Sequence, residues 1–190
     1  GISSAASDVY KRQVLEFGQI AAGPFAGSLF ADLGADVVKV ERPDGGDGLR
    51  SWPPLTEGPN GDAFSENFAS LNRNKRSITA DLKNANDLAY LKQLVGVCDI
   101  VLENFRPGVL QRLGLGYEEL RTLNPKLIYC SVSGFGQTGP NANMGAFDVT
   151  VQGFSGLMSV TGEAKGSPIK CGVPVGDFCA GLYAGYTILA

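Results

Sequence analysis

The most informative absence in this sequence is histidine, which does not occur among its 190 residues. Ser-His-Asp and Cys-His catalysis are therefore excluded, together with most zinc sites, because these sites use imidazole groups. Any acid, base or nucleophile must come from Asp, Glu, Lys, Tyr, Ser, Thr or Cys. A reactive carboxylate is the leading candidate, and Asp177, at a glycine-rich approach to an apolar helix, is the best placed one.

Cysteine, long apolar runs and clustered positive charge are scarce as well. The four cysteines have no CxxC spacing, which favours reduced core thiols and a cytoplasmic location over a metal cluster. No apolar run approaches the roughly 20 residues that span a bilayer. The net charge is −3 and the basic residues are scattered among acids, so nothing indicates nucleic-acid binding. We expect no metal, no membrane and no nucleic acid as partners.

Both ends of the chain need separate interpretation. Residues 1–13 show neither apolar periodicity nor helix capping, and residues 8–13 resemble a translated sequencing adapter. We interpret 1–13 as an adapter-derived or non-native segment, with the natural start and any targeting signal upstream. Residues 182–190 are still an apolar helical pattern without a stop signal. Residues 14–190 are therefore interpreted as the N-terminal part of a larger domain.

From Val14 onward the pattern alternates between short apolar strands and helices. This order predicts an α/β fold with a Rossmann-like parallel sheet. Residues 43–64, rich in Gly and Pro, are expected to form one long loop. The strands are expected at 14–17, 36–40, 76–82, 99–105 and 127–132, the helices at 24–33, 84–97, 109–113, 117–123 and 146–160, and a hairpin-like turn at 161–168 before the helix of Asp177.

A parallel sheet binds ligands at the carboxyl ends of its strands. The first such turn, residues 18–27, has neither GxGxxG spacing nor a P-loop ending. Residues 134–139 match GxGxxG literally, but coil follows at Pro140, so we interpret this match as a decoy. Glu41 and Arg42 end a strand where a dinucleotide fold keeps its ribose-binding acid, and the guanidinium suits phosphate or adenine better. A solvated ion pair is the alternative. Four basic residues are expected at or just after strand ends, where they form either a clamp for a polyanionic ligand or ordinary solvated charges. They are Arg42, Lys83, Arg106 and Arg112.

Six motifs occur in this order: Gly23-Pro24-Phe25-Ala26, residues 34–43 (GADVVKVERP), Asn74-Lys75-Arg76-Ser77-Ile78, residues 103–108 (ENFRPG), residues 133–140 (SGFGQTGP) and Gly176-Asp177. Taken together, they closely resemble the family III (CaiB/BaiF-type) CoA-transferases. The resemblance covers nearly everything after Gln13 and implies a Rossmann-like large domain that binds coenzyme A, incomplete here at its C-terminus. It also implies a smaller second domain, an interlocked homodimer, acyl-CoA and a small carboxylic acid as substrates, and no tightly bound cofactor.

The resemblance assigns Asp177 the role of nucleophile, which attacks an acyl-CoA thioester to form an aspartyl anhydride and then an aspartyl-CoA thioester. Such chemistry needs a carboxylate that reaches substrate but is shielded from water. Gly176 removes bulk at the approach, and the positive field at a helix start is expected to keep Asp177 ionised. Without the resemblance, an ordinary N-cap aspartate would be the favoured interpretation.

The same resemblance places the CoA contacts. Some family members carry Gln in the first turn and Lys at the start of the 133–136 loop, where this chain has Ala21 and Ser133, so polar contacts differ there. A glycine loop that shields the intermediate belongs to the C-terminal half, so the fragment alone is expected to bind CoA poorly and to be inactive. The expected contacts are Ala21, Ala22, Arg42, Ala80, Asp81, Leu82, Lys83, Asn104, Phe105, Arg106, Arg112, Ser133, Gly134, Phe135 and Gly136.

Two other functions stay open. The α-methylacyl-CoA racemase branch of the superfamily keeps an Asp near position 177 but uses the His of a Gly-His-Asp motif, and the aligned residues here are Ala146-Phe147-Asp148. Phe147 carries no titratable proton, which disfavours proton abstraction. A non-catalytic CoA- or nucleotide-binding module is the other alternative. The sequence leaves the acyl donor and acceptor unspecified.

Overall fold

Five short strands pair in parallel to form the central sheet. The structure, a computed structural model, describes residues 9–190. The order across the sheet is β5-β2-β1-β6-β7, which confirms the expected α/β fold with a Rossmann-like parallel sheet. The strands are β1 (Gln13–Glu16), β2 (Asp36–Glu41), β5 (Arg76–Thr79), β6 (Ile100–Glu103) and β7 (Ile128–Ser131).

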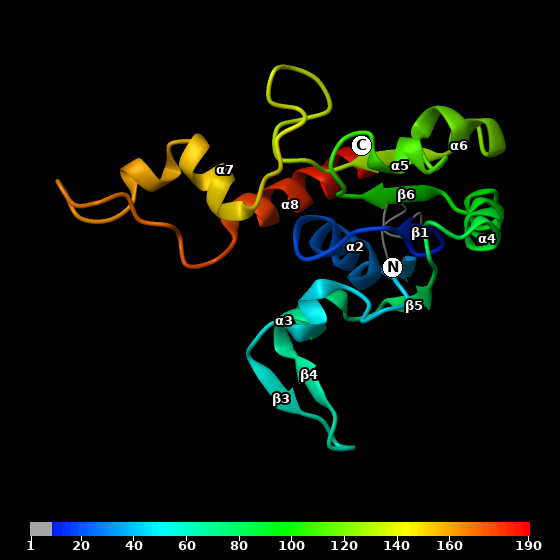
Figure 1. Cartoon of the computed structure of the whole chain (residues 1–190), viewed down its shortest axis with the longest axis horizontal. Helices are drawn as coiled ribbons and strands as arrows, with labels where there is room; N and C mark the ends of the chain where they lie inside the picture. Colours follow the sequence, from blue (N-terminus) through cyan, green and yellow to red (C-terminus); the bar gives the residue numbers. More distant parts are fainter. Residues whose placement is uncertain (1–8) are drawn as a thin grey trace, which may run out of the picture.

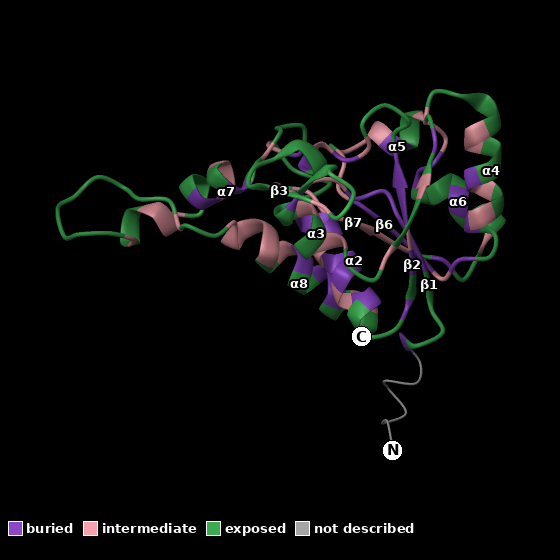
Figure 2. Cartoon of the chain, turned by 90° about the horizontal axis from the view of Figure 1, so that it is seen from below, coloured by how far each residue is buried: buried purple, intermediate pink, exposed green. Residues whose placement is uncertain are grey.

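Helices cover both faces of this sheet, as Figure 2 shows. One face carries α4 (Ala85–Val95), α5 (Val109–Arg112) and α6 (Tyr117–Leu123), whose leucines pack on Leu15 and Val101. The other face carries α2 (Ala22–Asp32) and α8 (Val175–Leu189), packed on Val14 and Val37. Because both faces are covered, the central strands are apolar runs rather than alternating ones, and this is why the sequence predicted them.

Helices α2 and α8 approach each other closely at Gly181. A Cβ atom there would lie only 2.8 Å from the carbonyl oxygen of Ala22, so only glycine allows this packing. Beside this contact, the rings of Phe25 and Phe178 pack with centroids 4.7 Å apart. The start of α8 is thereby held against the start of α2, next to the end of β1.

Two segments project from the sheet domain (Figure 1). The first contains η1 (Gly48–Ser51), the antiparallel pair β3 (Leu55–Glu57) and β4 (Ala63–Ser65), and α3 (Glu66–Asn72). The second contains α7 (Asp148–Phe154) and η2 (Leu157–Val160).

Both projections correct the sequence prediction. Residues 43–64 are not a featureless loop, because they hold η1 and most of a small hairpin. The helix expected over 146–160 is broken at Gly156, whose φ of 80° belongs to the left-handed region. Residues 161–168 form bends and turns without paired strands. The two short strands β3 and β4 are mostly exposed, so they carry no apolar pattern that a sequence could reveal.

The ends and the cysteines also differ in part from expectation. Residues 1–8 lie outside the described residues, and the adapter-derived origin of 1–13 stays a prediction. Residues 9–13 nevertheless contact the sheet domain: Val9 is buried and Gln13 pairs with Asp36 in the sheet. All four thiols are free, but only Cys98 is fully buried and Cys179 is exposed, so the core-thiol expectation is wrong for Cys179. Among residues 9–190, no helix is both long and apolar enough to cross a membrane.

Candidate active site

The sheet reverses its direction of growth between β1 and β6. From β1 the chain adds β2 and then β5 on one side, and then crosses to add β6 and β7 on the other. Ligands of open parallel sheets bind in the crevice at such a switch point, beyond the carboxyl ends of the strands. At this point the turn after β1 meets the loop after β6. The N–H of Gln19 donates to Oδ1 of Asn104 at 2.7 Å, and Nδ2 of Asn104 donates to the Gln19 carbonyl at 2.9 Å.

Buried charged side chains hold the rest of the turn after β1. Nζ of Lys39 donates to the Gly18 carbonyl at 2.6 Å, and the N–H of Ile20 donates to the carboxylate of Asp47 at 3.1 Å. Lys39 in turn forms ion pairs with Glu16 at 3.1 Å and with Asp47 at 2.9 Å. Ile20 has a φ of 63°, an unfavourable conformation for a β-branched residue. The surrounding hydrogen bonds therefore fix the turn in a strained shape.

A second lysine, Lys75, lies directly before β5 and also binds Glu16. Nζ of Lys75 pairs with Oε2 of Glu16 at 2.8 Å and donates to the Pro24 carbonyl at 2.7 Å, inside the first turn of α2. Burial lowers the pKa of Lys75 to about 8, against the opposing effect of Glu16. We call Glu16, Lys39, Asp47 and Lys75 the buried charge cluster. It joins β1, β2 and two loops directly beneath the switch point.

Asp177 lies in a small cavity at this switch point. It is the third residue of α8, with Pro174 at the N-cap position, so the interpretation as an ordinary N-cap aspartate is wrong. The cavity has a volume of about 120 Å³. It is lined by residues from α2, the β6 and β7 loops, α7 and α8: Ala22, Asn104, Val132, Ser133, Gly134, Ala146, Phe147, Val151, Gly176, Asp177 and Ala180.

The electrostatic environment of Asp177 opposes ionisation. Burial raises the pKa of Asp177 to about 6, and the negative charge of Asp148 raises it further in the same direction. The expected helix field would act in the opposite direction, lowering the pKa of Asp177, and it stays a prediction because the shift is set by burial and by Asp148. The Gly176 N–H, in the first turn of α8, donates to Oδ1 of Asp148 at 2.8 Å. At pH 7 the carboxylate is ionised but more basic than an ordinary aspartate.

The parallel order of the sheet brings the expected CoA contacts to one edge. Because neighbouring strands are about 4.8 Å apart, the five strand ends extend over about 19 Å, an elongated site. Arg112 lies farther out, on α5. Ala80–Lys83 follow β5, Arg42 follows β2, Ala21 and Ala22 follow β1, Asn104–Arg106 follow β6, and Ser133–Gly136 follow β7.

Several of these side chains have partners within the protein. The Asn104 amide is bound to Gln19, Phe105 packs into the core beneath α4 and α5, and Phe135 meets the ring of Phe154 edge-on at 5.1 Å. Arg42 and Lys83 are exposed. The four expected cations therefore do not converge on one point: Arg42 and Lys83 lie on one side of the switch point, and Arg106 and Arg112 on the other.

Glu41 is not free to bind a ribose, and it does not form an ion pair with Arg42. Its carboxylate is buried, where Arg50 binds it through two hydrogen bonds of 2.7 Å each. Burial alone would raise the pKa of Glu41, but the hydrogen bonds from Arg50, Ser77 and the Asp47 N–H outweigh it and lower the pKa to about 2. Glu41 thus anchors the loop that carries Asp47, and both alternatives considered for it from the sequence are wrong.

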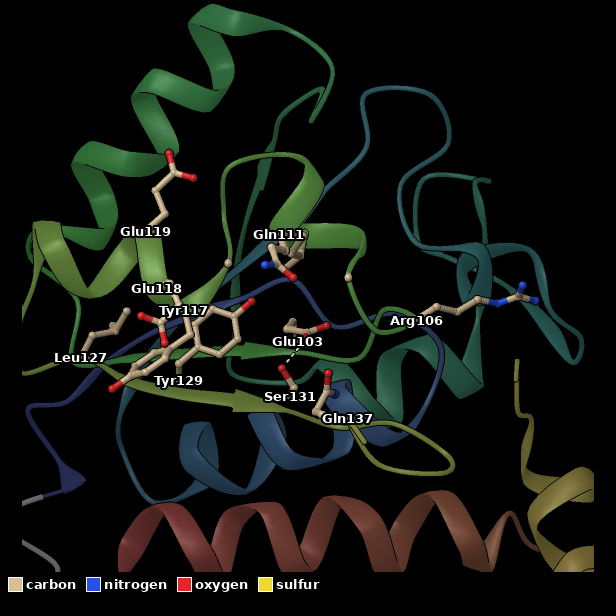
Figure 3. A pocket seen from close by; sticks show the side chains of 13 residues that line it. Glu103, Arg106, Gln111, Tyr117, Glu118, Glu119, Leu127, Tyr129, Ser131 and Gln137 are labelled. Carbon is tan, nitrogen blue, oxygen red and sulfur yellow. Dashed lines mark hydrogen bonds between the residues drawn. The ribbon is translucent and has the colours of Figure 1, made fainter. Parts of the chain in front are cut away.

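A larger hollow of about 710 Å³ lies beside β7 and the helices α5 and α6. Figure 3 shows its tyrosines, Tyr117 and Tyr129, and the hydrogen bond that Ser131 donates to Glu103, while Arg106 extends away from them. Burial raises the pKa of Glu103. Asp177 does not line this hollow, and the two further acids that do, Glu118 and Glu119, already pair with Arg121 and Lys92. Despite its size, we therefore do not place the active site in this hollow.

The buried charge cluster is what sequence reasoning missed. Lys39 interrupts the apolar run of a strand that is buried on both faces, and a charge at such a position needs a partner. That signal was present in the sequence, although the identity of the partners was not. The GxGxxG match at 134–139 is confirmed as a decoy, because the chain runs on as coil until α7 begins at Asp148. In the described part of the chain, no group of three or more Cys, Asp or Glu is arranged to hold a metal ion.

Comparison with known proteins gives consistent matches. A sequence model of the family described as CoA-transferase family III matches residues 11–190. A protein named succinate–glutarate CoA-transferase from Agrobacterium fabrum is 51% identical over 174 residues, which are 90% of this chain and 44% of that protein. A protein named acetyl-CoA:oxalate CoA-transferase from Acetobacter aceti is 43% identical, over 90% of this chain and 43% of its own length.

A solved structure agrees with these matches. A CaiB/BaiF family protein from Brucella suis superposes with a TM-score of 0.90 and is 43% identical, over 95% of this chain and 47% of its own. The chain thus spans less than half the length of the relatives that it matches.

Proposed function

The chain belongs to CoA-transferase family III, and from this membership we propose that the whole protein moves CoA from an acyl-CoA to a carboxylic acid, with Asp177 as the nucleophile. The observation that carries the proposal is the position of Asp177. It is a partly buried carboxylate in a cavity at the switch point of the sheet. Four of the expected CoA contacts line the same cavity: Ala22, Asn104, Ser133 and Gly134.

The chemistry proceeds in four balanced steps. Asp177 attacks the thioester carbonyl carbon, the C–S bond breaks, and CoA leaves as a thiolate from a mixed anhydride. The thiolate then attacks the Asp177 carbonyl carbon of the anhydride, which releases the donor acid as a carboxylate and leaves an aspartyl-CoA thioester. The acceptor carboxylate attacks this thioester to give a second anhydride and the thiolate again. The thiolate finally attacks the acceptor's carbonyl carbon, which frees Asp177 and the new acyl-CoA.

The cavity suits this sequence of steps. Its apolar lining from Ala22, Val151 and Ala180 limits the access of water to an anhydride. The raised pKa of Asp177 makes its ionised form a stronger nucleophile than an exposed aspartate. The turn after β1, held by the buried charge cluster, presents Ala21 and Ala22 without rearrangement, so the thioester can be bound by a preformed backbone.

We propose that at least one of the two acids is a dicarboxylate. The support comes from relatives at 42–51% identity, which are named for succinate, glutarate or oxalate. We also propose that the enzyme binds no cofactor tightly and that it works as a cytoplasmic homodimer, as the family resemblance implies. Acyl-CoA, acceptor acid and a second subunit would be its partners.

Hydroxylamine trapping tests the nucleophile in the full-length protein. After incubation with succinyl-CoA, hydroxylamine is expected to convert the activated Asp177 to a hydroxamate, which peptide mass spectrometry locates. Cys179→Ser is the matched control, because Cys179 is an exposed nucleophile two residues away and its loss should leave the adduct in place. Absence of any hydroxamate at Asp177 would refute the covalent mechanism.

The same incubation separates the two alternatives. Phe147 lines the cavity of Asp177, at the position where the racemase branch carries its histidine, so the required second proton-transfer group is replaced by a phenyl ring. Incubation in D₂O should therefore leave the α-carbon of the acyl group unlabelled beyond the spontaneous rate. Deuterium incorporation that depends on Asp177 would favour the racemase, and CoA binding without adduct or exchange would favour a binding module.

A further inference from the structure

Asp148, the first residue of α7, is a buried acid outside the residues that the sequence linked to CoA. Only 8% of its side chain is exposed. Its Oδ1 accepts the Gly176 N–H at 2.8 Å, and its Oδ2 accepts a hydrogen bond from Nε2 of Gln152 at 2.6 Å. A Cβ at position 176 would lie 3.1 Å from Oδ1, so glycine permits the close contact. Asp148 thus holds the residue directly before Asp177.

Gln152 binds the other end of the segment that leads into α8, residues 171–176. It is fully buried one helical turn beyond Asp148, and its Oε1 accepts the N–H of Cys171 at 2.8 Å. Two side chains of α7 therefore fix both ends of residues 171–176. This segment contains two glycines, Gly172 and Gly176, and would otherwise be free to vary in shape, so these contacts decide where Asp177 is placed.

Asp148 is also the principal charge facing Asp177. Helix α2 faces the start of α8 with Ala22 and Phe25, and its only acid, Asp32, lies at its far end. The β7 loop contributes the neutral Ser133 to the cavity. Other ionisable or charged groups near these elements are a lysine 3.9 Å from Asp148, a buried acid at the end of β6, and an arginine packed on Gly145: Lys170, Glu103 and Arg106.

We propose that Asp148 is a positioning residue for the nucleophile: it fixes the start of α8 through Gly176, and it places a negative charge beside the Asp177 carboxylate. The inference rests on the proposed function, because it assigns a role only if Asp177 reacts. It adds a second carboxylate to the site, one that acts through Asp177 and forms no bond with substrate.

The test is the pH dependence of kcat/KM in the full-length protein carrying Asp148→Asn. Asparagine keeps an oxygen for the Gly176 N–H but removes both the charge and the acceptor for Nε2 of Gln152. The lost charge should lower the acidic midpoint of the profile by about one pH unit, and the lost acceptor should lower the melting temperature. At pH 8, where Asp177 is ionised in both proteins, kcat should fall by about threefold because the variant carboxylate is less basic and nucleophilicity follows basicity with a slope below one. A merely structural role would change the melting temperature without moving the midpoint.

A matched variant guards against misfolding. Lys170 is 42% exposed, so Lys170→Gln should fold normally. This variant removes the cation that partly neutralises Asp148. It should therefore raise the acidic midpoint of the kcat/KM profile, whereas Asp148→Asn should lower it. A folded Asp148→Asn protein with an unchanged midpoint overturns the inference, and so does an unchanged midpoint in Lys170→Gln if the first variant does not fold. Failure of hydroxamate formation at Asp177 in the unmodified enzyme would instead overturn the proposed function.

Discussion

At the scale of single residues, the site is built from polar side chains whose partners lie on other loops or helices. Asp177 faces Asp148, Glu41 binds Arg50, and Asn104 binds the backbone of Gln19. The first contact joins the starts of α8 and α7, the second joins the end of β2 to η1, and the third joins the loops after β6 and β1. A sequence shows such residues as isolated polar positions, so their roles emerge only when the sheet order brings the loops together.

Replacement of Asp177 by Asn should stabilise the full-length protein in a pH-dependent way. The folded-state pKa is raised from 3.8 to about 6, so the folded state binds more protons than the unfolded state between these values. The ionised carboxylate therefore destabilises the folded state. This destabilisation is absent below about pH 4 and reaches its full value above about pH 6. Asp177→Asn should raise stability by about 1–2 kcal/mol at pH 7.5, after allowance for partial solvent exposure.

Melting temperatures of both proteins between pH 4 and pH 8 check this expectation. The difference between variant and parent should grow from near zero at pH 4 to its full value above pH 6. Asp62→Asn, at an exposed position in a turn, controls for the general effect of losing one negative charge. A difference that stays constant across the range would contradict the assigned pKa shift.

At the scale of elements, the decisive feature is the turn between β1 and α2. Its carbonyl and N–H groups are held by Lys39, Asp47, Asn104 and Lys75 rather than by regular secondary structure. This arrangement lets the backbone at Ala21 and Ala22 face the site in a fixed shape. The buried charge cluster therefore acts as a scaffold for one short segment of chain.

Lys39→Met tests this scaffold in the full-length protein. Removal of the ammonium leaves Glu16 and Asp47 buried with less compensation, and breaking such a buried ion pair costs about 3–5 kcal/mol. The turn also loses its bond to the Gly18 carbonyl, so CoA affinity should fall by roughly tenfold or more. Thermal denaturation and calorimetric titration with CoA measure the two effects.

The control for this variant is a lysine- or arginine-to-methionine change outside the cluster. Arg121 pairs with Glu118 at 3.0 Å on the exposed side of α6, so Arg121→Met should cost no more than about 0.5 kcal/mol. Its CoA affinity should equal that of the parent protein. If Lys39→Met is as stable and binds CoA as tightly as Arg121→Met, the cluster does not hold the turn.

Elements were predictable from the sequence where burial imposed a pattern on them. β6 is buried at all four positions and α6 was placed at its observed bounds, Tyr117–Leu123. The small hairpin of β3 and β4 was missed because its residues are mostly exposed and its pairing is not encoded in an apolar period. Gly156 ended a helix that hydrophobicity alone extended to Val160. For the site, the edge of the sheet was predictable but the partners of Asp177 and Glu41 were not, since they depend on tertiary contacts.

At the scale of the whole molecule, α8 presents one apolar face to the sheet domain and another to solvent. Leu182, Tyr183, Tyr186 and Leu189 are each at least half exposed, and their spacing places them along one side of the helix. Contiguous apolar surface of this kind marks an interface. Because the relatives are more than twice as long, we expect it to be covered in the complete protein.

If this face is covered in the complete protein, a double substitution on it should benefit the 190-residue chain and destabilise the full-length protein. Tyr183→Lys combined with Tyr186→Lys should reduce self-association and the binding of a hydrophobic dye by the 190-residue chain, because both side chains are more than 70% exposed there. In the full-length protein the same change should lower the melting temperature by several degrees, because it buries two charges. Tyr90→Lys, on α4 at the opposite face of the sheet, should do neither. If the double variant leaves the full-length protein as stable as the Tyr90 control, this side of α8 faces solvent in the complete protein, and its tyrosines are not part of an interface.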